Sequence, residues 1–327
     1  MRGRPASYVP VQQGEVSMIV GSVCMSHSPL LERNSADAGI ERRFDAAIAA
    51  ATGYIADLAP DLTIVFHPDH INGFFYDLLP AFCVGAQATS IGDFGTAAGR
   101  LSVPEDTAMD LSRFLLGAGI DTAISYKMEV DHGAVQPVEI LSAAHDLSNL
   151  IPVFINCAAA PRPTFERVRA LGCALGDWAR QRSERILIIG SGGLSHDPPM
   201  PALANATPEV RSRLINGGEL THAQRVARQA RAIEECKKVL AGTSKTLPLD
   251  PAWDRRLLDG FVSGDLTTLD DFSEDEITAT GGRGGHEVRS WFAALAALGP
   301  DYKAEELFYE PMDVWLTGMG VLKASPA

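Results

Sequence analysis

The sequence has few of the features that mark secreted, zinc-finger or membrane proteins. Its five cysteines are odd in number and never form a C-x-x-C pair, so we expect neither a disulfide framework nor a cysteine-ligated zinc site. It contains no run of about 18 apolar residues that could span a bilayer. Residues 1–16 lack the apolar centre of a signal peptide, and we expect them to form a flexible tail. These absences favour a soluble protein of the reducing cytoplasm.

Basic residues are also in short supply. The 28 Lys and Arg residues stand against 41 Asp and Glu residues, which gives the 327-residue chain a formal charge of −13. Nucleic acid or an anionic membrane would be repelled by such a surface, so a small-molecule partner is expected instead. The sequence also lacks internal repeats and low-complexity segments. Because 46% of the residues are hydrophobic, residues 17–327 can bury the core of a single domain.

The glycine-rich segment Gly190-Ser191-Gly192-Gly193 lacks two familiar signatures. A dinucleotide-binding fingerprint would need glycine at Ser195 and a helix where Pro198 and Pro199 stand. A nucleophile elbow around Ser191 would need glycine at Ile189, which argues against an acyl hydrolase. We therefore expect these glycines to permit close backbone approach beside His196.

What the sequence does contain is an alternation of apolar strand-like runs and amphipathic helices, which predicts a mostly parallel sheet covered by helices on both faces, a three-layer α/β/α fold. Strands are expected at 18–23, 62–66, 122–126, 151–156 and 185–189, and helices at 38–58, 104–116, 136–145, 164–182, 253–261, 273–280 and 288–298. A further charged helix at 219–240 has little apolar face and is expected outside the main sheet.

Four of the eight histidines share one context, because each lies just past an apolar run in a loop with Ser, Asp, Gly or Pro: His27, His70, His132 and His196. A lone loop histidine is usually a surface or structural residue. Four that follow strands of a parallel sheet would instead converge at the carboxyl edge of that sheet, where α/β proteins hold their ligands. This pattern predicts a functional site.

Histidines and carboxylates without clustered cysteines suit either zinc or a two-histidine, one-carboxylate Fe(II) site. Glu287 is the candidate carboxylate, since it follows a glycine-rich loop and opens an apolar helix, although it could simply complement the helix dipole. His67 competes with His70, but Pro68 holds His67 in an extended conformation on the strand. His145, His222 and His286 are expected to be structural or surface residues.

Several longer motifs now identify a resemblance to a known family. The chain resembles the class III (LigB-like) extradiol ring-cleavage dioxygenases in motifs that occur in order from about Met18 to Gly320: Ser26-His27-Ser28-Pro29-Leu30, Pro68-Asp69-His70, Asn72-Gly73-Phe74-Phe75-Tyr76-Asp77, Ile91-Gly92-Asp93-Phe94-Gly95, Val130-Asp131-His132-Gly133, Gly190 to His196, and His286-Glu287-Val288-Arg289-Ser290-Trp291.

The resemblance implies Fe(II)-dependent cleavage by O₂ of 3-(2,3-dihydroxyphenyl)propionate or a close 3-substituted catechol, in a homo-oligomer, giving a hydroxy-oxo-dienedioate. It implies that His27, His70 and Glu287 are the metal ligands and that His132 and His196 are the acid–base pair. It suggests His132 as proton donor and His196 as acceptor, an order that the residues alone do not give. Asp131 falls where the family has a neighbouring acidic residue.

Two functions of other classes compete with a dioxygenase. The same fold hosts binding proteins without enzymatic activity, and a zinc hydrolase would use the same types of ligand.

Asp69 is expected to accept a hydrogen bond from a histidine N–H. Arg283 and Lys127 lie near motif residues and are candidates for a substrate carboxylate, although a solvated surface position is the simpler expectation for both.

Overall fold

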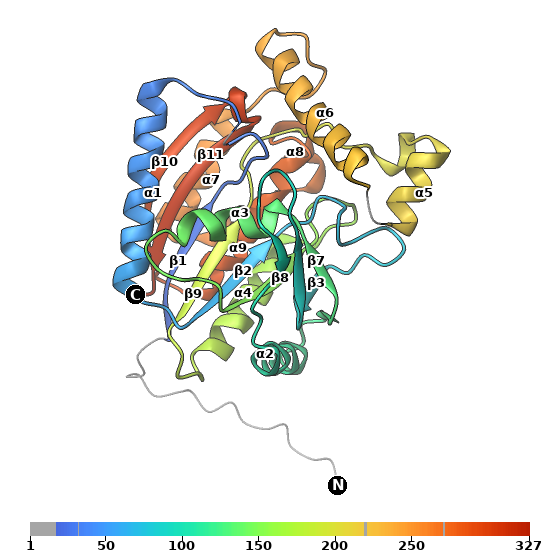
Figure 1. Ribbon diagram of the computed structural model, residues 1–327. Coiled ribbons are helices and arrows are strands. Elements are labelled where there is room, and N and C mark those ends of the chain that lie inside the picture. The colour runs from blue at the N-terminus through green and yellow to red at the C-terminus, as the bar shows by residue number, and fades with distance from the viewer. Residues whose placement is uncertain (1–17, 32, 219–220, 271) are drawn as a thin grey trace.

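The computed structural model describes residues 18–31, 33–218, 221–270 and 272–327, so the predicted tail at 1–16 lies outside the described residues. Within these ranges the main sheet has eight strands in the order β10-β11-β1-β9-β2-β8-β3-β6 (Figure 1). Their bounds are β1 Ile19–Met25, β2 Leu62–His67, β3 Phe82–Gly85, β6 Ala123–Ser125, β8 Leu150–Ile155, β9 Ile186–Ser191, β10 Lys303–Met312 and β11 Thr317–Ser325.

The centre of this sheet is parallel, as predicted, because β1, β9, β2 and β8 pair in parallel. The strands β11 and β3 flank it in antiparallel orientation, so the sheet is mixed. A second small sheet of the described chain contains β5 (Ala98–Arg100), β4 (Ala88–Ile91) and β7 (Met128–Val130). The small sheet and the β10–β11 hairpin were not expected, because their strands are short or mix polar and apolar residues irregularly.

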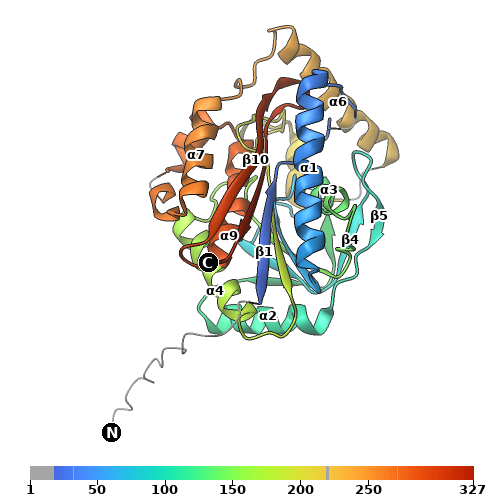
Figure 2. The same ribbon diagram turned by 90° about the vertical axis from the view of Figure 1, so that its left-hand side faces the viewer.

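Helices cover both faces of the main sheet, which confirms the three-layer architecture (Figures 1 and 2). One face carries α1 (Ala38–Leu58) and α3 (His132–Leu141), and the other carries α4 (Phe165–Ala179) and α9 (Val288–Ala297), with α2 (Glu105–Gly117) packed on α4. Further helices are α5 (Pro208–Asn216), α6 (His222–Leu240), α7 (Pro251–Ser263) and α8 (Glu274–Thr280). As expected, α6 lies outside the main sheet.

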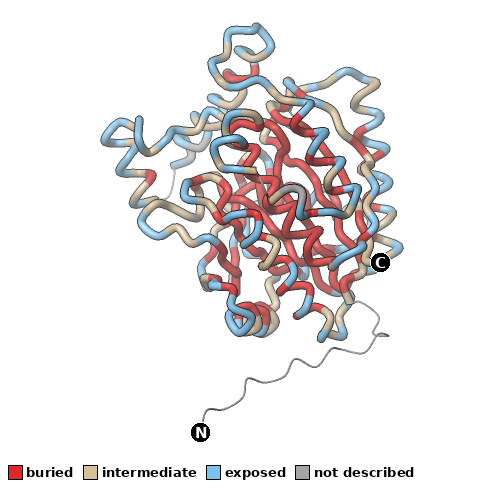
Figure 3. The backbone as a smooth tube through the Cα atoms, turned by 180° about the vertical axis from the view of Figure 1, so that it is seen from behind, coloured by how far each residue is buried: buried red, intermediate tan, exposed pale blue. Residues whose placement is uncertain are grey.

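The core has one large apolar cluster on each face of the main sheet and a smaller third cluster that includes Cys83, Val130 and Phe154. Figure 3 shows the buried residues gathered at the centre of the molecule. Successive side chains of a strand point to opposite faces, so Ile188 contributes to one large cluster while Leu187 and Ile189 contribute to the other. A strand buried on both faces therefore reads as one continuous apolar run. In the described part of the chain, no helix combines the length and the apolar character needed to cross a membrane.

Candidate active site

Three of the predicted histidines lie at the carboxyl ends of adjacent parallel strands. His27 follows β1, His70 follows β2 and His196 follows β9, and these strands are neighbours in the main sheet. The position of His132 in the fold differs from our expectation. It is the first residue of α3 and follows β7 of the small sheet rather than β6, and α3 begins four residues before the predicted start at Gln136 because Asp131 caps it. All four side chains line one cavity.

The imidazole Nε2 atoms and the Glu287 carboxylate meet at the floor of that cavity. His27 Nε2 lies 3.4 Å from His70 Nε2 and 3.4 Å from Glu287 Oε2. Glu287 Oε1 lies 3.2 Å from His70 Nε2 and 3.4 Å from His196 Nε2. Nitrogen and carboxylate oxygen atoms that face one another in this way are a donor set for a divalent metal ion.

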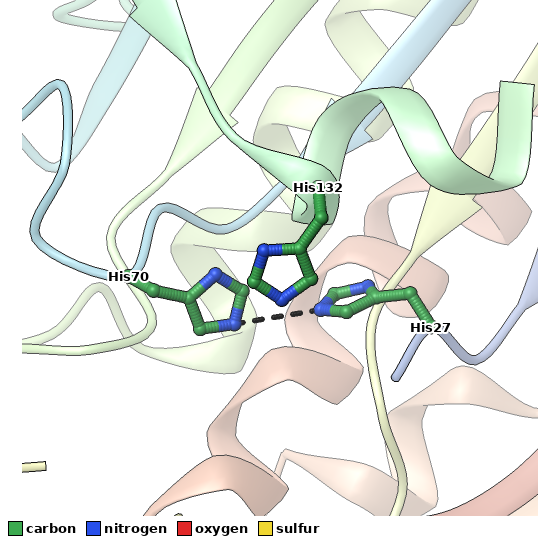
Figure 4. A group of neighbouring side chains, drawn as sticks. All are labelled: His27, His70 and His132. Atoms are coloured by element: carbon green, nitrogen blue, oxygen red, sulfur yellow. Dashed lines mark hydrogen bonds between the residues drawn. The ribbon is translucent and has the colours of Figure 1, made fainter. Parts of the chain in front are cut away.

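His27, His70 and His132 also form a cluster of buried metal-ligating groups (Figure 4). The rings of His70 and His132 are stacked, with centroids 4.5 Å apart and planes inclined by 15°. The ring of His27 is nearly perpendicular to each, at 89° and 87°. Because the lone pair of an imidazole nitrogen lies in the ring plane, His27 and His70 can converge on one ion more readily than the stacked His70 and His132.

His27 and His70 use Nδ1 for their outer hydrogen bonds, and their Nε2 atoms face Glu287 and each other. Ser191 Oγ donates to the carbonyl of Gly133, so it accepts from His27 Nδ1 at 3.0 Å. His70 Nδ1 donates to Asp131 Oδ2 at 3.0 Å. The proton of each neutral ring is therefore on Nδ1, and the Nε2 lone pair points to the centre.

His132 and His196 have the same tautomer with different partners. His132 Nδ1 donates to Asp93 Oδ2 at 2.7 Å, and the other oxygen of Asp93 accepts from the His132 backbone N–H, also at 2.7 Å. His196 Nδ1 donates to the carbonyl of Leu194 at 2.9 Å. Both rings thus direct a basic Nε2 into the site.

Opposing electrostatic effects act on this centre. Burial alone would lower the pKa of His70, but the carboxylates of Asp131 and Glu287 raise that pKa well above its ordinary value. Burial lowers the pKa of His27 to about 3. Burial disfavours the charged form of Glu287, yet His196 and His27 hold the pKa of this carboxyl well below its ordinary range. The centre is thus an anionic carboxylate beside imidazoles that compete for a proton, and these residues fit a divalent cation.

Glycines and a buried aspartate hold the His196 loop in place. A Cβ at Gly284 would lie 2.0 Å from His196 Nε2, and one at Gly193 would lie 2.6 Å from the same ring, so the predicted close approach is confirmed. Asp254, which is fully buried, accepts hydrogen bonds from Ser195 N and Ser195 Oγ, both at 2.7 Å. The ring of His196 therefore has little freedom to move.

The cavity above this floor has a volume of about 700 Å³, within the usual range for small-ligand sites. Its walls include Ile71, Phe94 and Leu316, and these three residues have left-handed φ angles of 57°, 49° and 56°. Such angles are strained for residues other than glycine, above all for the β-branched Ile71. Strained backbone of this kind clusters at functional sites, which agrees with the position of the histidines.

Two expectations about neighbouring residues were wrong, while the surface position expected for Lys127 was correct. Asp69 accepts no histidine N–H but the backbone N–H groups of Asn72, Gly73 and Phe74, and Asp131 fills the expected role at His70. Arg283 is half-buried rather than solvated, because it pairs with Asp197 at 2.5 Å and donates to the carbonyls of Pro198 and Met200. Neither Arg283 nor the exposed Lys127 lines the cavity.

The remaining histidines have structural partners where the structure describes them. His67 is buried on β2 with Nδ1 2.9 Å from the carbonyl of Pro68. His145 bonds the carbonyl of Pro60, and His286 lies between Thr278 and Arg289. The side chain of His222 lies outside the described part of the structure.

The sequence reasoning did not assign roles to Asp93 and Ser191, which orient His132 and His27. A signal for Asp93 was present, since it stands between Gly92 and Gly95 in a loop that follows an apolar segment. Both glycines have positive φ angles, and this tight loop turns the Asp93 carboxylate back toward α3.

Comparison with known proteins decides the family. Residues 21–320 match the family described as "Catalytic LigB subunit of aromatic ring-opening dioxygenase". The chain belongs to the LigB family. Two relatives named 2,3-dihydroxyphenylpropionate/2,3-dihydroxicinnamic acid 1,2-dioxygenase are each 45% identical to it, one from Paraburkholderia xenovorans (strain LB400) over 93% of this chain and 96% of its own, the other from a Rhodococcus species over 94% and 98%.

A solved structure of much lower sequence identity has a similar fold. The crystal structure of an uncharacterized protein from Escherichia coli K12 matches 93% of this chain and 99% of its own with a TM-score of 0.50 at 12% identity. That likeness concerns the fold alone. The matched family region contains all five predicted site residues, from His27 to Glu287.

Proposed function

We propose that this LigB-family chain is an Fe(II)-dependent extradiol dioxygenase that cleaves 3-(2,3-dihydroxyphenyl)propionate or a close 3-substituted catechol. The observation that carries the proposal is the convergence of four imidazole side chains and one buried carboxylate at the floor of a cavity of about 700 Å³. The names of the relatives, which specify 2,3-dihydroxyphenylpropionate, support this choice of substrate. We further propose that residues 17–327 act as one catalytic domain.

In this proposal His27, His70 and Glu287 hold the metal. Their facing atoms are 3.2–3.4 Å apart, and the Nδ1 protons of both histidines are already bound elsewhere. His132 is left out because its ring is stacked on that of His70, an arrangement in which the two rings do not converge on one ion. Two neutral imidazoles and one carboxylate are the ligand set of non-haem Fe(II) oxygenases.

Iron bound there would supply open positions at which catechol and O₂ can be brought together. The protein's own contribution is to bind the ring and to move protons. Phe94 and Ile71 give the cavity apolar walls for an aromatic ring. His196 Nε2 can accept the proton of a catechol hydroxyl, and His132 Nε2, whose imidazolium Asp93 would stabilise, can return a proton to oxygen.

In the overall reaction the ring bond beside the two hydroxyl-bearing carbons breaks, together with the bond of O₂. Both oxygen atoms enter a hydroxy-oxo-dienedioate, and the catechol is the reductant, so no further electron donor is needed. The assignment of His132 as donor and His196 as acceptor rests on the family resemblance. The cytoplasmic location and the homo-oligomeric state stay predictions.

The test is oxygen consumption by the protein loaded with Fe(II) without air and then mixed with 3-(2,3-dihydroxyphenyl)propionate. The proposal predicts uptake of O₂ in equal amount to substrate, together with a yellow ring-opened product. Protein loaded with Zn²⁺ is the matched control and is expected to be inactive. Turnover with Zn²⁺ and no O₂ uptake would support a hydrolase instead, and substrate binding without turnover in either form would support a binding protein.

A further inference from the structure

The wall of the cavity formed by α5 and α6 contains a group of arginines that the proposed chemistry does not use. Arg213 of α5 and Arg228 and Arg231 of α6 all line the cavity. On this wall, no Asp or Glu of the described residues lines the cavity. In a chain with a formal charge of −13, three cations gathered without a carboxylate are a local inversion of the overall charge.

These arginines are also close enough to repel one another. Burial lowers the pKa of Arg213, and the positive charges of Arg228 and Arg231 lower that pKa further. Throughout the described chain, none of the three forms an ion pair with a carboxylate, in contrast to Arg43, Arg162, Arg169, Arg180, Arg182, Arg255, Arg256 and Arg283. Like charges held together on a cavity wall attract an anionic group.

The three arginines differ in what they bind. Arg228 donates to the carbonyl of His70 and to Asn72 Oδ1, so it braces the loop that bears a predicted metal ligand. The side chains of Arg213 and Arg231 donate no hydrogen bond to any described residue, and both face the cavity. They are therefore the two guanidinium groups with donors available for a ligand.

Backbone hydrogen bonds connect α5, which is part of the wall, to the loop that follows His70 at the floor. The last turn of α5 accepts hydrogen bonds from the loop that follows His70, from Tyr76 N to Leu214 O and from Asp77 N to Ile215 O, both at 2.9 Å. Figure 1 shows α5 and α6 lying together outside the main sheet. A ring bound at the histidines thus has the arginines at one defined side of the cavity.

We propose that Arg213 and Arg231 determine substrate specificity by binding the carboxylate at the end of the substrate's side chain. A guanidinium presents parallel N–H donors that match the two oxygens of a carboxylate. The apolar residues of the wall that line the cavity, Leu214 and Ala232 among them, suit the methylene groups of such a side chain. This inference rests on the proposed function, because it concerns the catechol bound at the same site.

The experiment compares two substrates that differ only in charge, 3-(2,3-dihydroxyphenyl)propionate and its neutral propionamide, with the Fe(II)-loaded enzyme. In Arg213→Gln and Arg231→Gln, the KM for the propionate is expected to rise by about 10-fold to 100-fold, the loss that follows removal of a charge-assisted hydrogen bond. The kcat for the propionate and the KM for the propionamide are expected to change by less than about 2-fold, because neither depends on the charge of the wall. Arg213→Lys should recover part of the loss, since it keeps the charge without the planar fork.

Arg211→Gln is the matched control, because Arg211 lies on the same helix, is exposed and does not line the cavity. It should leave the preference for propionate over propionamide unchanged. Equal changes in KM for both substrates in Arg213→Gln and Arg231→Gln, or no change for either, would overturn the carboxylate site while leaving the dioxygenase proposal intact. If the wild-type enzyme cleaves neither catechol, the proposed function fails and this inference fails with it.

Discussion

The floor and the wall of the cavity are built in different ways. The floor joins loops after three adjacent strands of the main sheet to α3 and the start of α9, and His27, His132 and Glu287 are at most 4% exposed. The wall is formed by α5 and α6, outside the sheet, and α5 buries only Leu214 among its described residues. Polar atoms of the floor form hydrogen bonds with one another. Arg213 and Arg231 of the wall, in contrast, have no hydrogen-bond or ion-pair partner among the described residues.

Under the proposed function, this difference would separate the chemistry from the recognition of the substrate. Proton transfer and metal binding need atoms held to within a fraction of an ångström, which a buried and fully bonded floor supplies. A charged wall can select a side chain with looser geometry, because charge attraction falls off slowly with distance. Changes to the floor should therefore reduce kcat, and changes to the wall should alter KM.

The largest effect on turnover is expected from the acid–base pair. His132→Ala and His196→Ala should each lower kcat by about 100-fold or more, the usual contribution of a positioned general acid or base. Both variants should still bind iron, because neither residue is among the proposed ligands. Single-turnover rates at matched iron content measure this effect, and a kcat near that of wild type in either variant would contradict the assigned role.

A smaller loss is expected when the floor is displaced without removing a functional group. Gly284→Ala places a Cβ 2.0 Å from His196 Nε2 and must move that ring. Since a displacement of about 1 Å can reduce a rate by about 100-fold, kcat should fall by about 10-fold to 100-fold. Gly53→Ala is the control, because a Cβ there meets nothing within 4 Å. Equal kcat in the two variants would show that His196 is not held by the glycine loop.

Removing the charge behind His132 should have a milder effect still. Asp93→Asn keeps a hydrogen-bond acceptor near His132 Nδ1 but no longer stabilises its imidazolium. We expect kcat to fall by about 10-fold, a part of the 10²–10⁴ that a positioned acid or base supplies. Asp37→Asn, at the exposed start of α1, serves as the control. A kcat of Asp93→Asn equal to that of the wild type would argue against this partnership.

The smallest effect concerns stability rather than turnover, and it involves His67 on β2. Burial lowers the pKa of His67 to about 4, below the value near 6.5 expected in the unfolded chain. The unfolded state therefore binds more protons as the pH falls from 6.5 to 4, and the folded state loses stability by about 1.4 kcal/mol per pH unit. Denaturant unfolding of the metal-free protein should show a shallower loss in His67→Leu than in wild type. Equal slopes would mean that His67 does not contribute.

The same division explains what could be predicted from the sequence. The parallel strands, α1 and the convergence of the four histidines were predictable, because apolar runs are followed by His, Asp, Gly or Pro. The position of His132 at the start of α3 was not predicted. The resemblance to LigB dioxygenases added Glu287, which spacing alone left open. Asp93 and Ser191 had no predicted role, because their function depends on which imidazole atom they meet in three dimensions.

The wall was not predictable for a physical reason. Arg231 belongs to the charged segment predicted as a helix outside the main sheet, whereas no element was predicted around Arg213. Only the tertiary fold turns both side chains toward the cavity. By contrast, Arg283 looked available in the sequence and is occupied by Asp197 and two backbone carbonyls. Whether an arginine is free for a ligand depends on the acceptors around it, and sequence distance does not report them.

The most direct test of the account is the iron content of Glu287→Gln and His132→Gln, each loaded with Fe(II) without air and freed of unbound metal. The two side chains lie at the same floor, but only Glu287 is proposed as a ligand together with His27 and His70. We predict that His132→Gln keeps the wild-type amount of iron per chain and that Glu287→Gln loses most of it. Iron retained in Glu287→Gln and lost in His132→Gln would contradict the proposed ligand set and would favour the cluster of three histidines as the metal site.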